Sequence, residues 1–170
     1  VSVCFIWKAN NYVGRNCTVR NLLSDCFNET GEKIKITKDI IKKANCPSGK
    51  SNCDCDICRS IDNNTNPDYI YIEPDGREIK VNQVIEVMSR FETMPSVSKY
   101  SMYVINNADK LNGSSANKIL KFLEEPEEHI VGFYITDNLQ AVLPTIKSRC
   151  EIYNYNFEIN NILDLLNITE

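Results

Sequence analysis

The 170-residue sequence contains a single histidine, His129, and a single tryptophan. A site that needs two imidazole groups is therefore excluded, and His129 is interpreted as a loop or surface residue. No apolar run approaches the roughly 20 residues that a membrane-spanning helix needs. Residues 1–7 are apolar but short and lack the basic segment of a signal peptide, so they predict a buried strand. We expect a cytoplasmic protein without a membrane partner.

A large excess of one charge is also missing, because 19 Lys and Arg residues stand against 23 Asp and Glu residues. The formal net charge of −4 argues against nucleic-acid binding through overall charge and leaves only a local basic patch open. Hydrophobic residues make up 42% of the chain, an ordinary share for a globular protein. The length suits one domain and at most a fragment of a second.

Cysteine, in contrast, is abundant, and four of the eight cysteines fall within residues 46–58. Their spacing is C-x6-C-x-C-x2-C, formed by Cys46, Cys53, Cys55 and Cys58. Four thiolates from one short segment satisfy the tetrahedral geometry of Zn²⁺ and close a structural site. The metal would supply the folding energy that this polar segment lacks, with Lys50 and Arg59 expected to compensate its negative charge. Two disulfides, or thiols that are merely close together, are the alternatives.

The apolar pattern alternates between two periods along the chain. Short runs rich in Ile, Val, Tyr and Phe predict strands at 1–7, 69–72, 100–105, 131–136 and 151–157. Helical spacing occurs at 81–91 and 116–123, where Ser114 or Ser115 is expected to cap the second helix. This alternation predicts an α/β fold with a mostly parallel sheet between flanking helices. Residues 28–43 are polar and are interpreted as a helix-containing connection outside the core.

Three motifs follow one another in the second half of the chain. They are ADKLN at 108–112, ANKILKFLEEP at 116–126 and TIKSRC at 145–150. Together with the cysteine knuckle, this order resembles the bacterial clamp-loader subunits of DNA polymerase III, both the gamma/tau type and the delta-prime type. The resemblance implies an AAA+, P-loop NTPase-like core over residues 1–157, with the knuckle inserted at 46–58. It also implies that residues 158–170 begin a helical lid domain.

The resemblance places a phosphate-binding loop after the first strand, and this loop is degenerate. The motif GxxxxGK[ST] uses glycines to cradle phosphates, Lys to contact them and Ser or Thr to bind Mg²⁺. Here Ala9 replaces the first glycine, Gly14 is kept, Arg15 replaces Lys and Asn16 replaces Ser or Thr. Arg cannot occupy the compact Lys position in the same way, and Asn is a poor Mg²⁺ ligand. The loop position is present without its chemistry.

A second loss occurs at the end of the middle strand. An ATPase of the resembled family carries an Asp for Mg²⁺ and a Glu for the attacking water there, whereas this chain has Asn106 and Asn107. A neutral amide cannot act as a general base near pH 7. Thr136 matches the family's sensor position and is expected to remain as a structural hydroxyl. The residues thus favour the delta-prime type, with ATP neither bound nor hydrolysed.

Arg149 matches the arginine of the family's SRC motif. The resemblance implies an arginine finger that acts in trans on ATP held by a neighbouring subunit; the bland alternative is a surface arginine paired with a carboxylate. It also implies a role in DNA replication, with gamma/tau and delta subunits, the sliding clamp and primer-template DNA as partners. Two other functions stay open: an active gamma/tau-type ATPase, and a zinc-knuckle nucleic-acid-binding module with no replication role.

Overall fold

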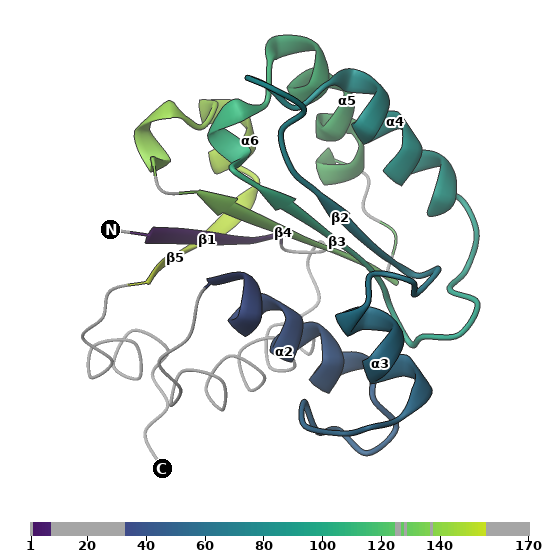
Figure 1. The fold of residues 1–170 in the computed structure, drawn as a ribbon. Coiled ribbons are helices and arrows are strands. Elements are labelled where there is room, and N and C mark those ends of the chain that lie inside the picture. Colours follow the sequence, from purple (N-terminus) through teal and green to yellow (C-terminus); the bar gives the residue numbers. More distant parts are fainter. Residues whose placement is uncertain (1, 8–32, 125–126, 128, 137, 156–170) are drawn as a thin grey trace.

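A five-stranded sheet with helices on both faces organises the computed structural model, which describes residues 2–7, 33–124, 127, 129–136 and 138–155 (Figure 1). The strands lie in the order β2-β3-β4-β1-β5. Their bounds are β1 Ser2–Trp7, β2 Tyr69–Ile72, β3 Ser101–Asn106, β4 Ile130–Thr136 and β5 Cys150–Tyr155. Each predicted strand is therefore present within one or two residues of its expected limits. The predicted α/β class is confirmed.

Strand direction decides which loops share an edge of this sheet. β2, β3 and β4 are parallel, with Tyr69 opposite Met102 and Asn106 opposite Ile135. β1 runs antiparallel to both β4 and β5, so β5 points the same way as β4. Asn106 and Thr136 consequently end their strands at one edge, whereas Trp7 ends β1 at the other edge, opposite Cys150. Periodicity alone does not encode strand direction, and the reversal of β1 was not predicted.

One face of the sheet is covered by α4 and α5, with α6 beside them (Figure 1). Their bounds are α4 Val81–Arg90, α5 Gly113–Glu124 and α6 Pro144–Lys147, and two 3₁₀ turns, η1 Ala108–Lys110 and η2 Leu139–Ala141, precede α5 and α6. α4 buries Val84 and Val87, with Phe91 completing the stripe. Asn112 caps α5, because its side-chain oxygen accepts the Ser115 N–H at 2.8 Å. The predicted cap, Ser114 or Ser115, is therefore wrong. The helix already begins at Gly113, before its apolar stripe, so the capping residue is Asn112.

The other face is covered by α2, Lys33–Asn45, and α3, Asp56–Asp62 (Figure 1). Ile40 and Ile41 of α2 are fully buried against β3 and β4, so the expectation that residues 28–43 stay outside the core is wrong for this helix. The apolar stripe is narrow and flanked by lysines. Lys42 is nevertheless mostly buried, because its ammonium lies 3.0 Å from Asp62 and 3.2 Å from Asp39. These ion pairs offset the cost of burying the Lys42 charge, so a helix rich in lysine can still pack against the sheet.

Some predictions fall outside the described residues. The degenerate phosphate loop at 8–16 and the lid expected at 158–170 both do, and they stay predictions. Among the described helices, none combines the length and the apolar character needed to span a bilayer.

Candidate functional site

The four knuckle cysteines converge on one point. Cys46 follows α2, Cys53 and Cys55 lie in the connecting loop, and Cys58 belongs to α3. Their four sulfur atoms all lie within 4.8 Å of one another. The Cys46 and Cys55 sulfurs are 3.8 Å apart, which matches the spacing of about 3.8 Å between ligands of a tetrahedral ion with Zn–S bonds of about 2.3 Å. The donor set and its geometry fit Zn²⁺.

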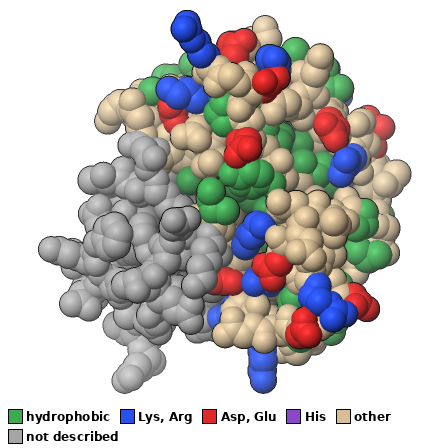
Figure 2. Space-filling view, viewed as in Figure 1, with side chains coloured by type: hydrophobic (Ala, Val, Ile, Leu, Met, Phe, Trp, Pro, Cys, Tyr) green, Lys and Arg blue, Asp and Glu red, His purple; other side chains and the backbone are tan. Residues whose placement is uncertain are grey.

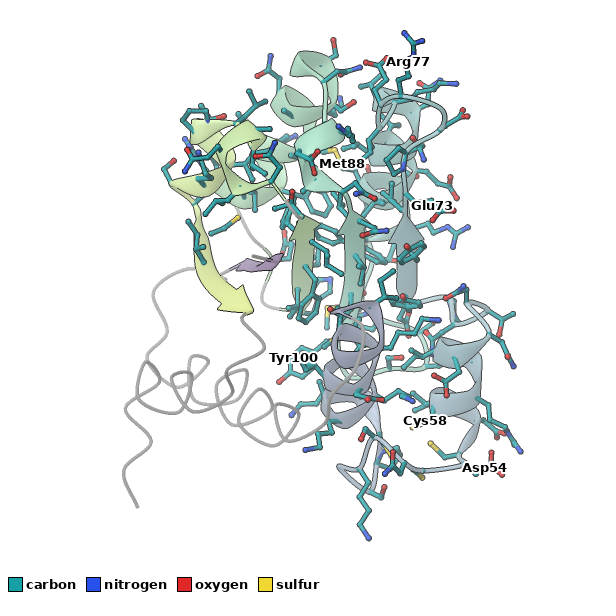
Figure 3. All side chains as sticks on the ribbon, turned by 60° about the vertical axis from the view of Figure 1, so that its left-hand side comes forward. Asp54, Cys58, Glu73, Arg77, Met88 and Tyr100 are labelled. Carbon is teal, nitrogen blue, oxygen red and sulfur yellow. The ribbon has the colours of Figure 1, made fainter. Side chains whose placement is uncertain are left out.

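The disulfide alternative does not match this geometry. All four cysteines are free thiols, and 3.8 Å between the Cys46 and Cys55 sulfurs is nearly twice the disulfide bond length of about 2.05 Å. Figure 3 shows Cys58 and Asp54 at the end of the molecule formed by α2 and α3, far from Arg77. The knuckle therefore lies between α2 and α3, at a distance from the carboxyl edge of the sheet.

The ionisation of the thiols shows what a cation would contribute. Burial opposes ionisation of Cys46, but hydrogen bonds from the hydroxyl and N–H of Ser48 and the N–H of Lys50 outweigh it and lower the pKa to about 6. Burial, followed by the neighbouring sulfurs of Cys55 and Cys46, raises the pKa of Cys58. The Cys46 thiolate therefore forms easily, and its negative charge then opposes ionisation of Cys58. A divalent cation at their centre would remove this repulsion and stabilise all four thiolates.

The charged residues around the knuckle pair mainly with one another. Arg59 binds Asp56 and lies 3.7 Å from Asp54, so its charge compensates two aspartates directly. Lys50 contributes through its backbone N–H, which is one of the groups that lower the pKa of Cys46. The sequence indicated both residues as compensating charges, and the structure places Arg59 in that role through the aspartates.

At the carboxyl edge of the sheet, a hydrogen-bonded cluster surrounds the end of β4. The Thr136 hydroxyl donates to Asp109 at 2.6 Å and accepts the Asn138 N–H at 3.0 Å. Lys110 lies 3.3 Å from the other oxygen of Asp109. Burial alone would raise the pKa of Asp109, but its bonds to Thr136 and Lys110 outweigh burial and lower it. Thr136 is buried, and its hydroxyl proton is used in the hydrogen bond to Asp109.

The two amides predicted at this edge lie where β3 ends. Asn106 is the last residue of β3, and Asn107 has the left-handed backbone conformation with φ of 55°, which asparagine tolerates better than most residues. Both are half-buried. The end of β3 therefore carries two neutral amide side chains. The phosphate-loop positions Ala9, Gly14, Arg15 and Asn16 lie outside the described residues.

Arg149 lies between α6 and β5, on the surface beside the end of α5. Its Nη2 donates to Glu124 at 2.7 Å, and its Nη1 donates to the Thr145 carbonyl oxygen at 2.9 Å. The arginine side chain is 34% exposed and the Glu124 side chain 52% exposed. Glu124 was part of the LEEP motif, but no role was predicted for it. The two residues are 25 positions apart, so local spacing could not predict that they pair. The only hint in the sequence was an acidic residue at the end of a predicted helix.

Comparison with known proteins gives concordant matches. A family model described as "DNA polymerase III, delta subunit" matches residues 25–158. The DNA polymerase III subunit delta' of Bacillus subtilis is 36% identical over 97 residues, which are 57% of this chain and 30% of the relative. The subunit gamma of Buchnera aphidicola subsp. Schizaphis graminum is 32% identical over 127 residues, which are 73% of this chain and 35% of the relative.

A solved structure agrees with the fold. The crystal structure of a DNA polymerase III gamma subunit-related protein from Thermotoga maritima has a TM-score of 0.50 and 23% identity, and the match covers 62% of this chain and 38% of that protein. The chain spans about a third of the length of the curated delta' and gamma relatives, at 30% and 35%. The family match covers most of the chain, from before α2 to the end of β5. This chain therefore belongs to the DNA polymerase III delta subunit family.

Proposed function

We propose that this chain is part of a delta-prime-like subunit of the DNA polymerase III clamp loader, an AAA+ machine of DNA replication. In this proposal it lacks a working ATP site and supplies Arg149 to ATP held by the neighbouring subunit. Its partners are then the gamma/tau and delta subunits, and through the complex the sliding clamp and primer-template DNA. Zn²⁺ is its structural metal, held by Cys46, Cys53, Cys55 and Cys58 and remote from the carboxyl edge of the sheet.

The observation that carries the proposal is the contrast between the two polar sites. The carboxyl edge of the sheet carries Asn106 and Asn107 in place of carboxylates, and its nearby carboxylate, Asp109, is engaged by Thr136 and Lys110. Arg149, in contrast, lies at the surface and keeps a third of its side chain exposed. A domain with this arrangement is poorly equipped to activate its own nucleotide. It can still present a cation to a phosphate bound elsewhere.

The decisive experiment is Arg149→Ala in the full-length protein, reconstituted with the other clamp-loader subunits. Arginine fingers stabilise charge on the transferring phosphoryl group and contribute about 10³-fold or more to the rate. We expect ATP turnover at the site served by Arg149 to fall by about that factor while the complex still assembles. Arg90→Ala, which removes an exposed arginine that pairs with Glu86 on α4, is the matched control and should leave turnover unchanged. Equal ATP turnover in the two variants would contradict the assignment of Arg149 as an arginine finger.

The active gamma/tau-type ATPase is the second candidate, because gamma and tau relatives also match this chain, at 32% identity. Calorimetry with Mg-ATP on the full-length protein separates the two. The proposal predicts no binding at micromolar nucleotide. Micromolar affinity for Mg-ATP, with hydrolysis by the isolated subunit, would favour the gamma/tau type.

A further inference from the structure

The contacts of Arg149 suggest a role for the glutamate that ends α5. We infer that Glu124 is a positioning residue for Arg149, holding its guanidinium at the surface in the orientation from which it reaches a neighbour's phosphate. This rests on the proposed function. The two side chains meet at 2.7 Å from elements that are distant in sequence. α5 and α6 pack against the same core through Ile119 and Ile146, so the geometry of the pair follows from the fold.

Three hydrogen bonds hold the guanidinium group. Nη2 binds Glu124, while Nη1 binds the Thr145 carbonyl oxygen at 2.9 Å and the Ser148 hydroxyl at 3.4 Å. A guanidinium carries five N–H donors. Among the residues that the structure describes, no acceptor takes the N–H of Nε or the second hydrogen of Nη2. The group is therefore oriented by its own domain while two donors remain for an outside anion.

Positioning matters because a free arginine side chain samples many rotamers. Fixing those rotamers only when a phosphate arrives costs conformational entropy, and a side chain already held in place loses less. The carboxylate also repels the phosphate, which opposes this gain. Glu124 is half exposed, so solvent and salt weaken that repulsion, and the orienting effect is the larger one. An exposed pair of this kind is expected to change a rate about two- to fivefold.

The chain provides a graded set of variants for the test. Glu124→Ala removes the acceptor, while Glu124→Gln keeps an oxygen of the same reach without the charge. In the reconstituted full-length complex, we expect Glu124→Ala to lower kcat for ATP about two- to fivefold with little change in KM, because the finger acts on the transition state. Glu124→Gln should recover most of the loss. Glu86→Ala, which breaks the exposed Glu–Arg pair on α4, is the control and should change neither parameter.

A double-mutant cycle shows whether Glu124 acts through Arg149. In the Arg149→Ala background, Glu124→Ala should have no further effect on kcat. The Glu124→Ala single variant should have the same thermal midpoint of unfolding as the parent protein. The inference fails if Glu124→Ala lowers kcat equally with and without Arg149, if it leaves kcat unchanged, or if it raises kcat. Failure of the proposed function is a separate result, because it appears as unchanged turnover in Arg149→Ala alone, and it removes the positioning role as well.

Discussion

Gly132 in β4 is the residue at which a single methyl group should matter most. It pairs in register with Tyr103 of β3, and a Cβ at this position would collide with the phenol ring of that tyrosine. Tyr103 cannot easily move, because it is fully buried and its hydroxyl lies 2.8 Å from the hydroxyl of Tyr134. Overpacking of a core typically costs about 1–3 kcal/mol.

We therefore expect Gly132→Ala to lower the free energy of unfolding in urea by about 1–3 kcal/mol. The matched control is Gly113→Ala at the start of α5, where an added Cβ meets no atom within 4 Å. That variant should change the free energy of unfolding by less than about 0.5 kcal/mol. Equal stability of the two variants would show that the close approach to Tyr103 does not constrain the sheet.

Asp68 is the residue whose ionisation should link stability to pH. It is buried, and its carboxylate accepts the N–H groups of Ser96, Val97 and Ser98 at 2.7–2.8 Å. Burial alone would raise its pKa, but these hydrogen bonds outweigh burial and lower it. The stabilisation is complete above the unfolded value of about 3.9 and is lost as the pH falls through the lower folded value.

Asp68→Asn should therefore destabilise the protein by about 1–3 kcal/mol at pH 7, because an amide oxygen cannot satisfy three N–H groups. The difference from the parent protein should shrink below about pH 4. Unfolding by urea, measured from pH 7 down to pH 3, checks both parts. Asp75→Asn, at an exposed residue paired with Lys80, is the control. A difference that stays constant with pH would show that the charge of Asp68 is not what holds residues 96–98.

What the sequence could predict at this scale depended on how far apart the partners are. The cysteine site was predictable because its four ligands lie within thirteen positions. Asp68 and Ser96 are 28 positions apart, and Glu124 and Arg149 are 25 apart. Such contacts form only when the chain has folded, so no local sequence pattern predicts them. Thr136 was expected to be a structural hydroxyl, and its bond to Asp109 is consistent with that prediction.

Elements were predictable where their apolar pattern is unbroken. The strands and helices α4 and α5 have runs or stripes that a few polar neighbours do not obscure. In α2 the sequence KIKITKDIIKKAN spreads five lysines around Ile40 and Ile41, which hides a core-facing stripe. The direction of β1 depends on which strands it pairs with, and that information is spread over the whole chain.

The knuckle should be the element that depends most on metal. α3 has seven residues and buries only Cys58 and Ile61, too little for a helix of this length to be stable alone. We expect the purified protein to contain one zinc per chain. Removing the metal with a chelator should abolish hydrogen-exchange protection in α3 while the amides of β3 stay protected.

Substitution of single cysteines provides the control for this prediction. Cys55→Ser should lower the zinc content, whereas Cys150→Ser, outside the knuckle, should retain one zinc per chain. Metal analysis and hydrogen exchange on the same samples check the two effects together. A parent protein with much less than one zinc, or α3 amides that stay protected in the chelated protein, would contradict the structural role of the metal.

At the scale of the whole molecule, charge is balanced in sign. On the described part of the face seen in Figure 2, acidic and basic side chains are interspersed, and the chain carries a formal net charge of −4. Binding to DNA through phosphates requires clustered Lys and Arg and weakens steeply with salt. We therefore expect no binding of this chain to a primer-template duplex at micromolar concentration in about 0.15 M salt.

Fluorescence anisotropy of a labelled duplex, measured at two salt concentrations, tests this expectation. The reconstituted complex on the same duplex is the positive control, because DNA contact is proposed to arise through the assembly. Micromolar binding by the chain alone, with a steep salt dependence, would instead favour the nucleic-acid-binding module.

The position of β1 within the sheet has a consequence for synthesis. Val3 pairs with Thr136 on one side and Asn154 on the other, so β1 leaves the ribosome long before either of its partners. At about 5–20 residues per second, the wait for β4 is roughly 7–27 s. During this interval β1 has neither of its partner strands, so its unpaired backbone groups are available to strands of other chains. A nascent-chain chaperone would therefore have its greatest effect before β4 is complete.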